Sequence, residues 1–295
     1  MPYFNIVAET SENTVVTEYE PVKKRSDSYQ SEAALEQEFI RLLCEQGYEY
    51  LPIHTEKDLI ANLRKKLEEL NNYQFSDTEW DDFFKNAVAN PNEHIVEKTR
   101  KIQEDNVQVL TRDDGSSKNI TLIDKKNIHN NRLQVINQYK VNAAKGSREG
   151  SLGCVIGTDE GARYDNRYDV TVLVNGLPLV HIELKRRGVA IREAFNQINR
   201  YQRDSFWAGC GLYEYIQIFV ISNGTNTKYY SNSTRRNAEK EHEKRGASKT
   251  KTSNSFEFTC FWADANNRVI PDLIDFTKTF FAKHTILNIL TKYCI

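Results

Sequence analysis

Two short apolar runs joined by Asn-Gly constrain the fold of this chain more than any other feature. The first run is Tyr-Asp-Val-Thr-Val-Leu-Val at residues 168–174, and the second is Leu-Pro-Leu-Val-His-Ile-Glu-Leu-Lys at residues 177–185. Apolar runs on either side of Asn175-Gly176 predict two antiparallel strands joined by a tight turn. Any fold inferred for the chain must therefore contain this hairpin.

Charged residues stand at the open end of the predicted hairpin. Asp169 opens the first strand, and Glu183 and Lys185 close the second. Because side chains alternate between the two faces of a strand, Glu183 and Lys185 point the same way, while Ile182 and Leu184 point into the core. Two carboxylates and an ammonium gathered at one place suit metal-dependent cleavage of a phosphodiester.

The register of the hairpin decides whether the two acids meet. A two-residue turn would put Asp169 on the opposite face from Glu183. A three-residue loop over residues 174–176 would pair Asp169 with His181 and bring it diagonal to Glu183, with roughly 7–8 Å between the backbones. Such a loop requires a left-handed backbone conformation at its third residue, which is Gly176. We therefore predict the three-residue loop or an equivalent bulge.

The residue types also predict the cofactor. Asp169 and Glu183 would hold a divalent cation, and Mg²⁺ suits them better than Zn²⁺ because the ligands are oxygens and no Cys or His cluster is nearby. Lys185 would orient the attacking water or stabilise charge that develops on the phosphate. The alternative is a surface strand that ends in a Glu–Lys pair, since Glu-x-Lys alone is a common tripeptide.

A basic amphipathic helix is predicted over residues 190–203. Its apolar face is formed by residues at helical spacing, Ile191, Ala194, Phe195, Ile198 and Tyr201. Gln197 lies four residues before Tyr201 and shares its side of the helix. Five arginines would contact DNA phosphates, namely Arg186, Arg187, Arg192, Arg200 and Arg203. The alternative for the arginines is a solvated face on a helix packed against the core.

Taken in order, Asp169, Glu183-x-Lys185 and Gln197-x-x-x-Tyr201 resemble the motifs of the PD-(D/E)xK nuclease superfamily in its RecB-like branch. More closely, residues 168–207 resemble the N-terminal nuclease domain of the R subunit of type I restriction enzymes. The likeness extends over nearly the whole chain, through residues 31–50, 137–139, 221–224 and 261–264. One departure is Tyr168, which stands where the superfamily name expects Pro, at a position with no chemical role in the mechanism.

The resemblance implies an α/β fold in which a mixed β-sheet is flanked by helices, with a restriction-endonuclease-like core and helical N-terminal insertions. It implies a Mg²⁺-dependent endonuclease that cuts unmethylated foreign double-stranded DNA non-specifically after ATP-driven translocation, with modification and specificity subunits as partners. Asp169, Glu183, Lys185, Gln197 and Tyr201 would be its catalytic residues.

The same resemblance sets expectations for the organisation of the chain. We expect an endonuclease domain over residues 1–265, with a mobile polar loop at about 231–255, and a helical linker toward an ATPase motor over residues 266–295. No G-x-x-x-x-G-K-[ST] phosphate loop occurs in these 295 residues, so ATP would act on the complete subunit and not on this piece.

A further catalytic acid is implied on the first predicted helix, over residues 31–46. Ser31 is a plausible N-cap there. Glu32 and Glu36 both flank the buried stripe of this helix, and counting back from Gly47 favours Glu36. The alternative is that both are surface glutamates favoured near a helix N-terminus by its dipole.

Composition limits the remaining possibilities. A net charge of −1 means that nucleic-acid binding must be local. Five scattered cysteines without C-x-x-C spacing indicate reduced thiols. Neither a signal peptide nor an apolar run of about 18 residues occurs, so we expect a cytoplasmic protein that does not contact a membrane.

Two other functions remain open from the sequence. The first is a repair or recombination nuclease of the same fold, which an ATPase domain encoded directly downstream would disfavour. The second is a non-catalytic assembly module that retains the fold. The joint presence of Asp169, Glu183 and Lys185 on one face argues against that module. We also expect slow or absent cleavage by this domain alone, without its motor and partner subunits.

Overall fold

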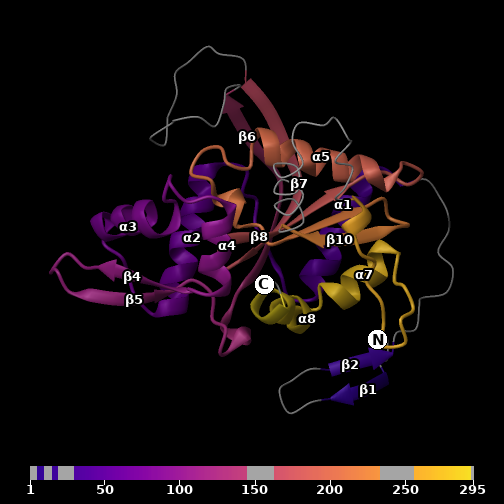
Figure 1. Cartoon of the computed structure of the whole chain (residues 1–295), viewed down its shortest axis with the longest axis horizontal. Helices are drawn as coiled ribbons and strands as arrows, with labels where there is room; N and C mark the ends of the chain where they lie inside the picture. Colours follow the sequence, from indigo (N-terminus) through magenta and orange to yellow (C-terminus); the bar gives the residue numbers. More distant parts are fainter. Residues whose placement is uncertain (1–4, 10–14, 19–29, 145–162, 233–255, 294–295) are drawn as a thin grey trace, which may run out of the picture.

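A six-stranded mixed sheet forms the centre of the chain in the computed structural model, which describes residues 5–9, 15–18, 30–144, 163–232 and 256–293 (Figure 1). The strand order is β10-β9-β8-β7-β6-β3. Neighbouring strands are antiparallel except for β8–β9 and β3–β6, which are parallel. The strands of this sheet are β3 Glu49–Tyr50, β6 Leu133–Ala144, β7 Arg163–Val174, β8 Leu177–Leu184, β9 Ile218–Ser222 and β10 Thr227–Ser231.

Two small antiparallel pairs accompany the central sheet, β1 Asn5–Glu9 with β2 Val15–Glu18 and β4 Val107–Thr111 with β5 Ser117–Thr121. The α-helices are α1 Glu32–Glu45, α2 Glu56–Asn71, α3 Asp77–Phe83, α4 Ile95–Gln103, α5 Ile191–Asp204, α7 Leu273–Phe280 and α8 Lys283–Asn288. Shorter helical turns are η1 Phe84–Val88, η2 Ile128–Asn130, η3 Leu212–Tyr215, η4 Phe256–Phe258 and η5 Ile289–Tyr293.

The central strands are buried on both faces because helices cover each side. All eight residues of β8 are buried. Helix α5 packs on one face, and α1 lies on the other, where α7 packs against it (Figure 1). A two-sided cover explains why both runs of the hairpin are apolar and do not simply alternate. The predicted fold class, a mixed sheet flanked by helices, is confirmed.

The N-terminal helices begin where the sequence provides caps. The Ser31 hydroxyl accepts a hydrogen bond from the Ala34 amide at the start of α1, and the Thr55 hydroxyl does the same for Asp58 in α2. Helices α2, α3 and α4 lie together to one side of the sheet, next to β4 and β5 (Figure 1). They are the predicted helical insertions.

The hairpin itself corrects the predicted register. Its turn is a two-residue turn, with Val174 paired to Leu177 and with positive φ at both Asn175 (51°) and Gly176 (86°). The three-residue loop was therefore the wrong choice, and the equivalent bulge is what occurs. Leu173 pairs with Pro178 but Val172 pairs with Val180, so β8 has one extra residue, Leu179.

The bulge changes which residues meet at the open end. Beyond it, Thr171 pairs with His181 and Val170 with Ile182. Continuing this register places Asp169 across from Glu183, and not across from His181 as predicted. Relative to a regular hairpin with a two-residue turn, the pairing shifts by one residue in the direction opposite to the predicted shift. Asp169 and Glu183 still share a face of the sheet, because a shift by any odd number of residues exchanges the two faces of a strand.

A second correction concerns residues 256–262, for which the sequence predicts a strand. The structure has the turn η4 over Phe256–Phe258 and only an isolated bridge between Cys260 and Tyr229 of β10. The Phe256 ring packs edge-on against Phe195 of α5, with 5.5 Å between ring centroids. This local aromatic contact competes with extension of the strand.

The C-terminal helices pack onto the core. The Phe281 ring lies edge-on to Phe39 of α1, with 5.4 Å between centroids, and the Tyr48 hydroxyl donates to the Phe281 carbonyl. The predicted mobile loop lies, beyond residue 232, outside the described residues. No helix in the described part of the chain is both long and apolar enough to span a bilayer.

Candidate active site

The structure brings Asp169, Glu183 and Lys185 together at the end of the β7–β8 hairpin. One carboxylate oxygen of Asp169, Oδ2, accepts a hydrogen bond of 2.9 Å from the Leu184 amide, which fixes Asp169 beside the second strand. The Lys185 ammonium lies 3.1 Å from Oε1 of Glu183 and 3.1 Å from the Leu184 carbonyl oxygen. The spatial meeting that the sequence predicts is therefore present in the structure.

Burial makes this group of charges unusual. Glu183 is fully buried, and Asp169 is half-buried. Burial raises the pKa of Asp169 well above its ordinary value, and the nearby Glu183 carboxylate raises it further. Burial also raises the pKa of Glu183, although the Lys185 ammonium opposes this rise. Two adjacent carboxylates with one partial counter-charge favour an additional cation between them.

The donor atoms suit a hard divalent cation. Asp169 and Glu183 offer carboxylate oxygens, and the Lys185 ammonium is the cation that contacts Glu183 at Oε1. No group of three His, Cys, Asp or Glu side chains placed to hold a metal occurs in the described parts of the chain. A pair of carboxylates is nonetheless a sufficient protein contribution for Mg²⁺, which completes its shell with waters and substrate phosphates. The residues therefore fit such an ion.

Glu36 joins the same site from the other face of the sheet. Its carboxylate accepts hydrogen bonds from Asn137, at 2.6 Å, and from Gln138. The side chain is 8% exposed, and its pKa is raised mainly by burial, with the charge of Asp169 adding to the rise. Asn137 and Gln138 thus hold Glu36 close enough to Asp169 for the two charges to interact.

Glu32 lies one turn earlier on α1 and is exposed. Its Oε1 accepts a hydrogen bond of 3.3 Å from the Arg186 amide, and its negative charge raises the pKa of Glu183. Both glutamates border the site, but only Glu36 is buried against it. The geometry therefore favours Glu36 as the additional acid.

Gln197 and Tyr201 stand together over the site on α5. The Gln197 amide donates a 2.5 Å hydrogen bond to the Tyr201 hydroxyl, which donates to the Arg167 carbonyl at 2.9 Å. Tyr201 is buried, and its pKa is raised by burial and then by the charge of Glu183. The Tyr201 hydroxyl therefore links the Gln197 side chain to the backbone of β7. Gln197 is the half-exposed member of the pair.

The predicted DNA-binding arginines lie just after β8 and along α5. Arg186, Arg192 and Arg200 are exposed, whereas Arg187 is half-buried. The Arg192 guanidinium lies 4.6 Å from the Phe256 ring centroid, and that of Arg200 lies 5.4 Å from the Tyr201 ring centroid. Arg203 belongs to α5, but its side chain lies outside the described part.

Sequence reasoning missed two basic residues on the neighbouring strands β6 and β7. Lys140 of β6 pairs directly with Arg167 of β7, and both are exposed. Like charges opposite one another are unfavourable in an antiparallel pair. Arg167 also interacts electrostatically with Glu36. The available signal was a basic residue two positions before Asp169 on the same strand.

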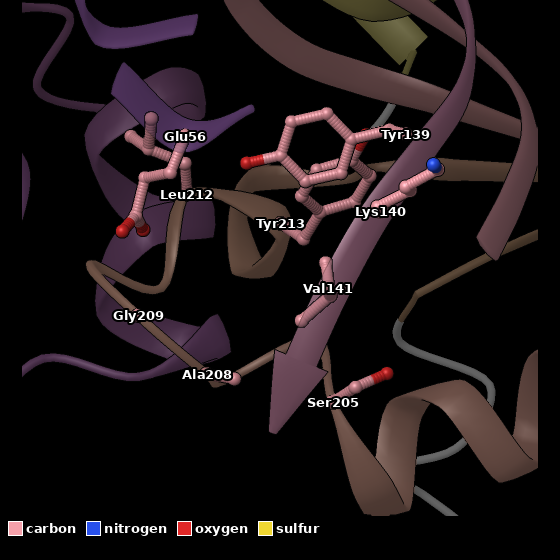
Figure 2. Close-up of a pocket in the computed structure, with 9 residues that line it drawn as sticks. All are labelled: Glu56, Tyr139, Lys140, Val141, Ser205, Ala208, Gly209, Leu212 and Tyr213. Carbon is pink, nitrogen blue, oxygen red and sulfur yellow. The ribbon is translucent and has the colours of Figure 1, made fainter. Parts of the chain in front are cut away.

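A pocket of about 110 Å³ is lined in part by Lys140 and by neither of the hairpin acids (Figure 2). It is lined by residues of β6, the start of α2 and the loop after α5, among them Glu56, Tyr139, Ser205 and Tyr213. Figure 2 shows the Lys140 ammonium pointing away from the Tyr139 hydroxyl. The Ser205 hydroxyl forms a hydrogen bond of 2.7 Å with the Tyr168 hydroxyl. A residue that lines the pocket therefore holds the residue before Asp169.

Comparison with known proteins identifies the family. The profile described as "Type I restriction enzyme R protein N terminus" matches residues 29–238. The Escherichia coli type I restriction enzyme EcoprrI endonuclease subunit is 45% identical over 290 residues, which cover 98% of this chain and 82% of that protein. The SsaAORF53P endonuclease subunit of Staphylococcus saprophyticus is 35% identical over 272 residues, covering 90% of this chain and 24% of that protein.

A Staphylococcus aureus relative, the SauMSSORF170P endonuclease subunit, is 33% identical over 273 residues, covering 91% of this chain and 25% of that subunit. The chain thus spans about a quarter of the length of the two staphylococcal subunits. The matched regions contain the hairpin acids, Lys185 and the helix with Gln197 and Tyr201. The chain belongs to the family formed by the N-terminal region of type I restriction enzyme R proteins.

Proposed function

We propose that this chain is the Mg²⁺-dependent endonuclease module of a type I restriction enzyme, with Asp169, Glu183 and Lys185 at its catalytic centre. The observation that carries the proposal is the convergence of these three side chains at one end of a hairpin, with both carboxyl groups perturbed by burial. Strongly perturbed acids that face a charge partner are a mark of functional sites. Membership of the family and the names of the relatives support the same reaction.

Each residue has a distinct task in this proposal. A bound divalent cation would neutralise the scissile phosphate and lower the pKa of a bound water. Asp169 and Glu183 would hold that ion. The Lys185 ammonium would stabilise the negative charge that develops on the phosphate oxygens. Gln197 would position the DNA backbone, because Tyr201 fixes it above β7.

DNA binding would use two groups of exposed basic side chains. Arg186, Arg192 and Arg200 lie just after β8 and on α5, and Lys140 and Arg167 lie on β6 and β7, so these side chains would hold a duplex by its phosphates. Such contacts carry no base readout, which agrees with cleavage that does not depend on sequence. Recognition, methylation and ATP-driven translocation would belong to specificity and modification subunits and to a motor region.

The proposal predicts direct binding of the ion. Titration of the chain with Mn²⁺, followed by electron paramagnetic resonance of the free ion, should reveal a site that Mg²⁺ competes for. Asp169→Asn should remove this site while retaining an oxygen that can accept from the Leu184 amide. Wild-type Mn²⁺ binding in Asp169→Asn would contradict the assigned site.

The two candidate glutamates of α1 can be separated by paired variants. Glu36→Gln should lower DNA cleavage by the assembled enzyme by roughly 10- to 100-fold, because it removes a buried charge that faces Asp169. Glu32→Gln, on an exposed side chain one turn away, should lower it by about threefold or less. Plasmid cleavage rates measured side by side decide the matter. A larger loss in Glu32→Gln would reverse the assignment.

The perturbed acids also predict a pH dependence of stability without a divalent cation. The pKa of Glu183 is raised in the folded state above its value in the unfolded state. The contribution of protonated Glu183 to stability is therefore complete below the unfolded pKa, and it is lost as the pH rises through the folded pKa. Glu183→Gln should therefore become more stable relative to wild type between pH 5 and 8, by on the order of 1–3 kcal/mol. Urea unfolding in EDTA at both pH values measures this difference. A difference that stays constant with pH would contradict the raised pKa.

A further inference from the structure

His181 is a buried polar side chain that the catalytic assignment leaves unused. It is fully buried, two residues before Glu183 on the same face of β8. Neither ring nitrogen has a hydrogen-bond partner of good geometry among the described residues, although an interaction with the Val170 backbone opposes the fall in the pKa of the imidazole that burial causes. Leaving such groups unpaired in the core is costly, and native proteins rarely do so without a reason.

The surroundings of the ring fix its position. Aromatic side chains contact it edge-on, with centroid distances of 5.6 Å to Tyr168, 6.1 Å to Tyr201 and 5.5 Å to Phe206. Its strand neighbours are Thr171 on one side and Phe219 on the other. The imidazole therefore has little freedom to turn toward another acceptor.

One acceptor does face this ring. Nε2 of His181 lies 3.5 Å from Oε2 of Glu183, and that oxygen is itself buried without a hydrogen-bond partner among the described residues. The other oxygen of Glu183, Oε1, contacts the Lys185 ammonium. Two atoms without hydrogen-bond partners thus lie 3.5 Å apart, slightly beyond hydrogen-bond length, and Oε2 is the carboxylate oxygen that does not contact Lys185.

We propose that His181 is a positioning residue for Glu183: Nε2–H donates to Oε2 and holds the carboxylate so that Oε1 faces Lys185 and the cation-binding side. This inference rests on the proposed function, in which Glu183 is a ligand. Residues that hydrogen-bond to a ligand from behind orient it, and their loss commonly weakens metal binding by about 10- to 100-fold.

Three variants test the role of His181. His181→Phe keeps an aromatic ring in the same setting and removes the donor. His181→Gln removes the ring and retains an N–H donor. Thr171→Val is the matched control, because Thr171 is the buried cross-strand neighbour of His181 and bonds to the Tyr213 hydroxyl, 3.3 Å away. Mn²⁺ affinity by electron paramagnetic resonance and urea stability in EDTA are measured for the 295-residue chain.

The expected result separates positioning from packing. His181→Phe should weaken Mn²⁺ binding by about 10- to 100-fold without loss of stability in EDTA. His181→Gln should bind Mn²⁺ more tightly than His181→Phe, and Thr171→Val should bind like wild type. If His181→Phe does not fold, His181→Gln and Thr171→Val are compared instead. The inference then requires that both variants bind Mn²⁺ with an affinity within threefold of wild type.

Two results would overturn the inference. One is Mn²⁺ affinity in His181→Phe within twofold of wild type, and the other is an equal loss in Thr171→Val, which would indicate a packing effect. Failure of the proposed function looks different. In that case wild-type protein binds no Mn²⁺, or Asp169→Asn binds it unchanged. Loss of binding in Asp169→Asn together with unchanged binding in His181→Phe removes only the role of His181.

Discussion

Replacing Asp169 or Lys185 with Ala should abolish DNA cleavage by the assembled restriction enzyme while ATP hydrolysis continues. Removing one group that stabilises charge in a transition state typically lowers rate by roughly 10²–10³-fold. Loss of Asp169 would also remove a ligand of the cation. We therefore expect no linear product from a supercoiled plasmid within the time in which wild-type enzyme completes cleavage.

The assay needs controls for folding and assembly. ATP hydrolysis by the same preparation shows whether the variant subunit has assembled with its partners. Asp169→Asn adds a check on local structure, because its amide oxygen can still accept from the Leu184 amide. Glu45→Ala and Lys65→Ala remove exposed charges from α1 and α2 and should cut at the wild-type rate. Cleavage at the wild-type rate in Asp169→Ala or Lys185→Ala would exclude that residue from the mechanism.

Gly176→Ala should cause the largest loss of stability among simple substitutions in the hairpin. Gly176 has a φ of 86°, which a Cβ makes unfavourable, and a Cβ built there would lie 2.6 Å from Cα of Leu63 in α2. A backbone atom at this distance cannot move aside without shifting the helix. Strain and overpacking together predict a loss on the order of 2–5 kcal/mol.

A second glycine provides the matched control for this substitution. Gly115, in the turn between β4 and β5, has a φ of 80°, and a Cβ built there would meet nothing within 4 Å. Gly115→Ala should therefore show the conformational cost alone, about 1–2 kcal/mol. Urea denaturation of both variants compares them directly. Equal losses of stability in the two variants would mean that the close approach of Leu63 adds nothing to the cost of Gly176→Ala.

The hairpin explains why Asn-Gly was a reliable signal even though the predicted loop was wrong. Asn175 is buried and donates to the Leu122 carbonyl at 3.0 Å, while its side-chain oxygen accepts from the Arg132 amide at 2.8 Å. Both turn residues adopt positive φ, which Asn and Gly tolerate better than other residues. The turn type could be read from the two residues, but the bulge at Leu179 could not, because nothing in an apolar run distinguishes a bulged residue from a paired one.

The candidate site was predictable where its residues are close in sequence. Glu183 and Lys185 share a face because they are two apart on a strand, and Gln197 meets Tyr201 because they are four apart on a helix. Arg167 was missed because an exposed basic residue on a strand carries no distinctive signal. His181 was not singled out because a lone histidine in an apolar run is most often a core residue.

The sequence by itself predicted the hairpin, the helix that carries Gln197 and Tyr201, and the candidate acids, because these follow from local periodicity and residue chemistry. Tertiary structure alone decided that Asp169 faces Glu183 across a bulge, that Glu36 reaches them from α1 through Asn137 and Gln138, and that Oε2 of Glu183 is left facing His181. The physical reason is that register and helix docking depend on packing between segments distant in the chain, which no local pattern encodes.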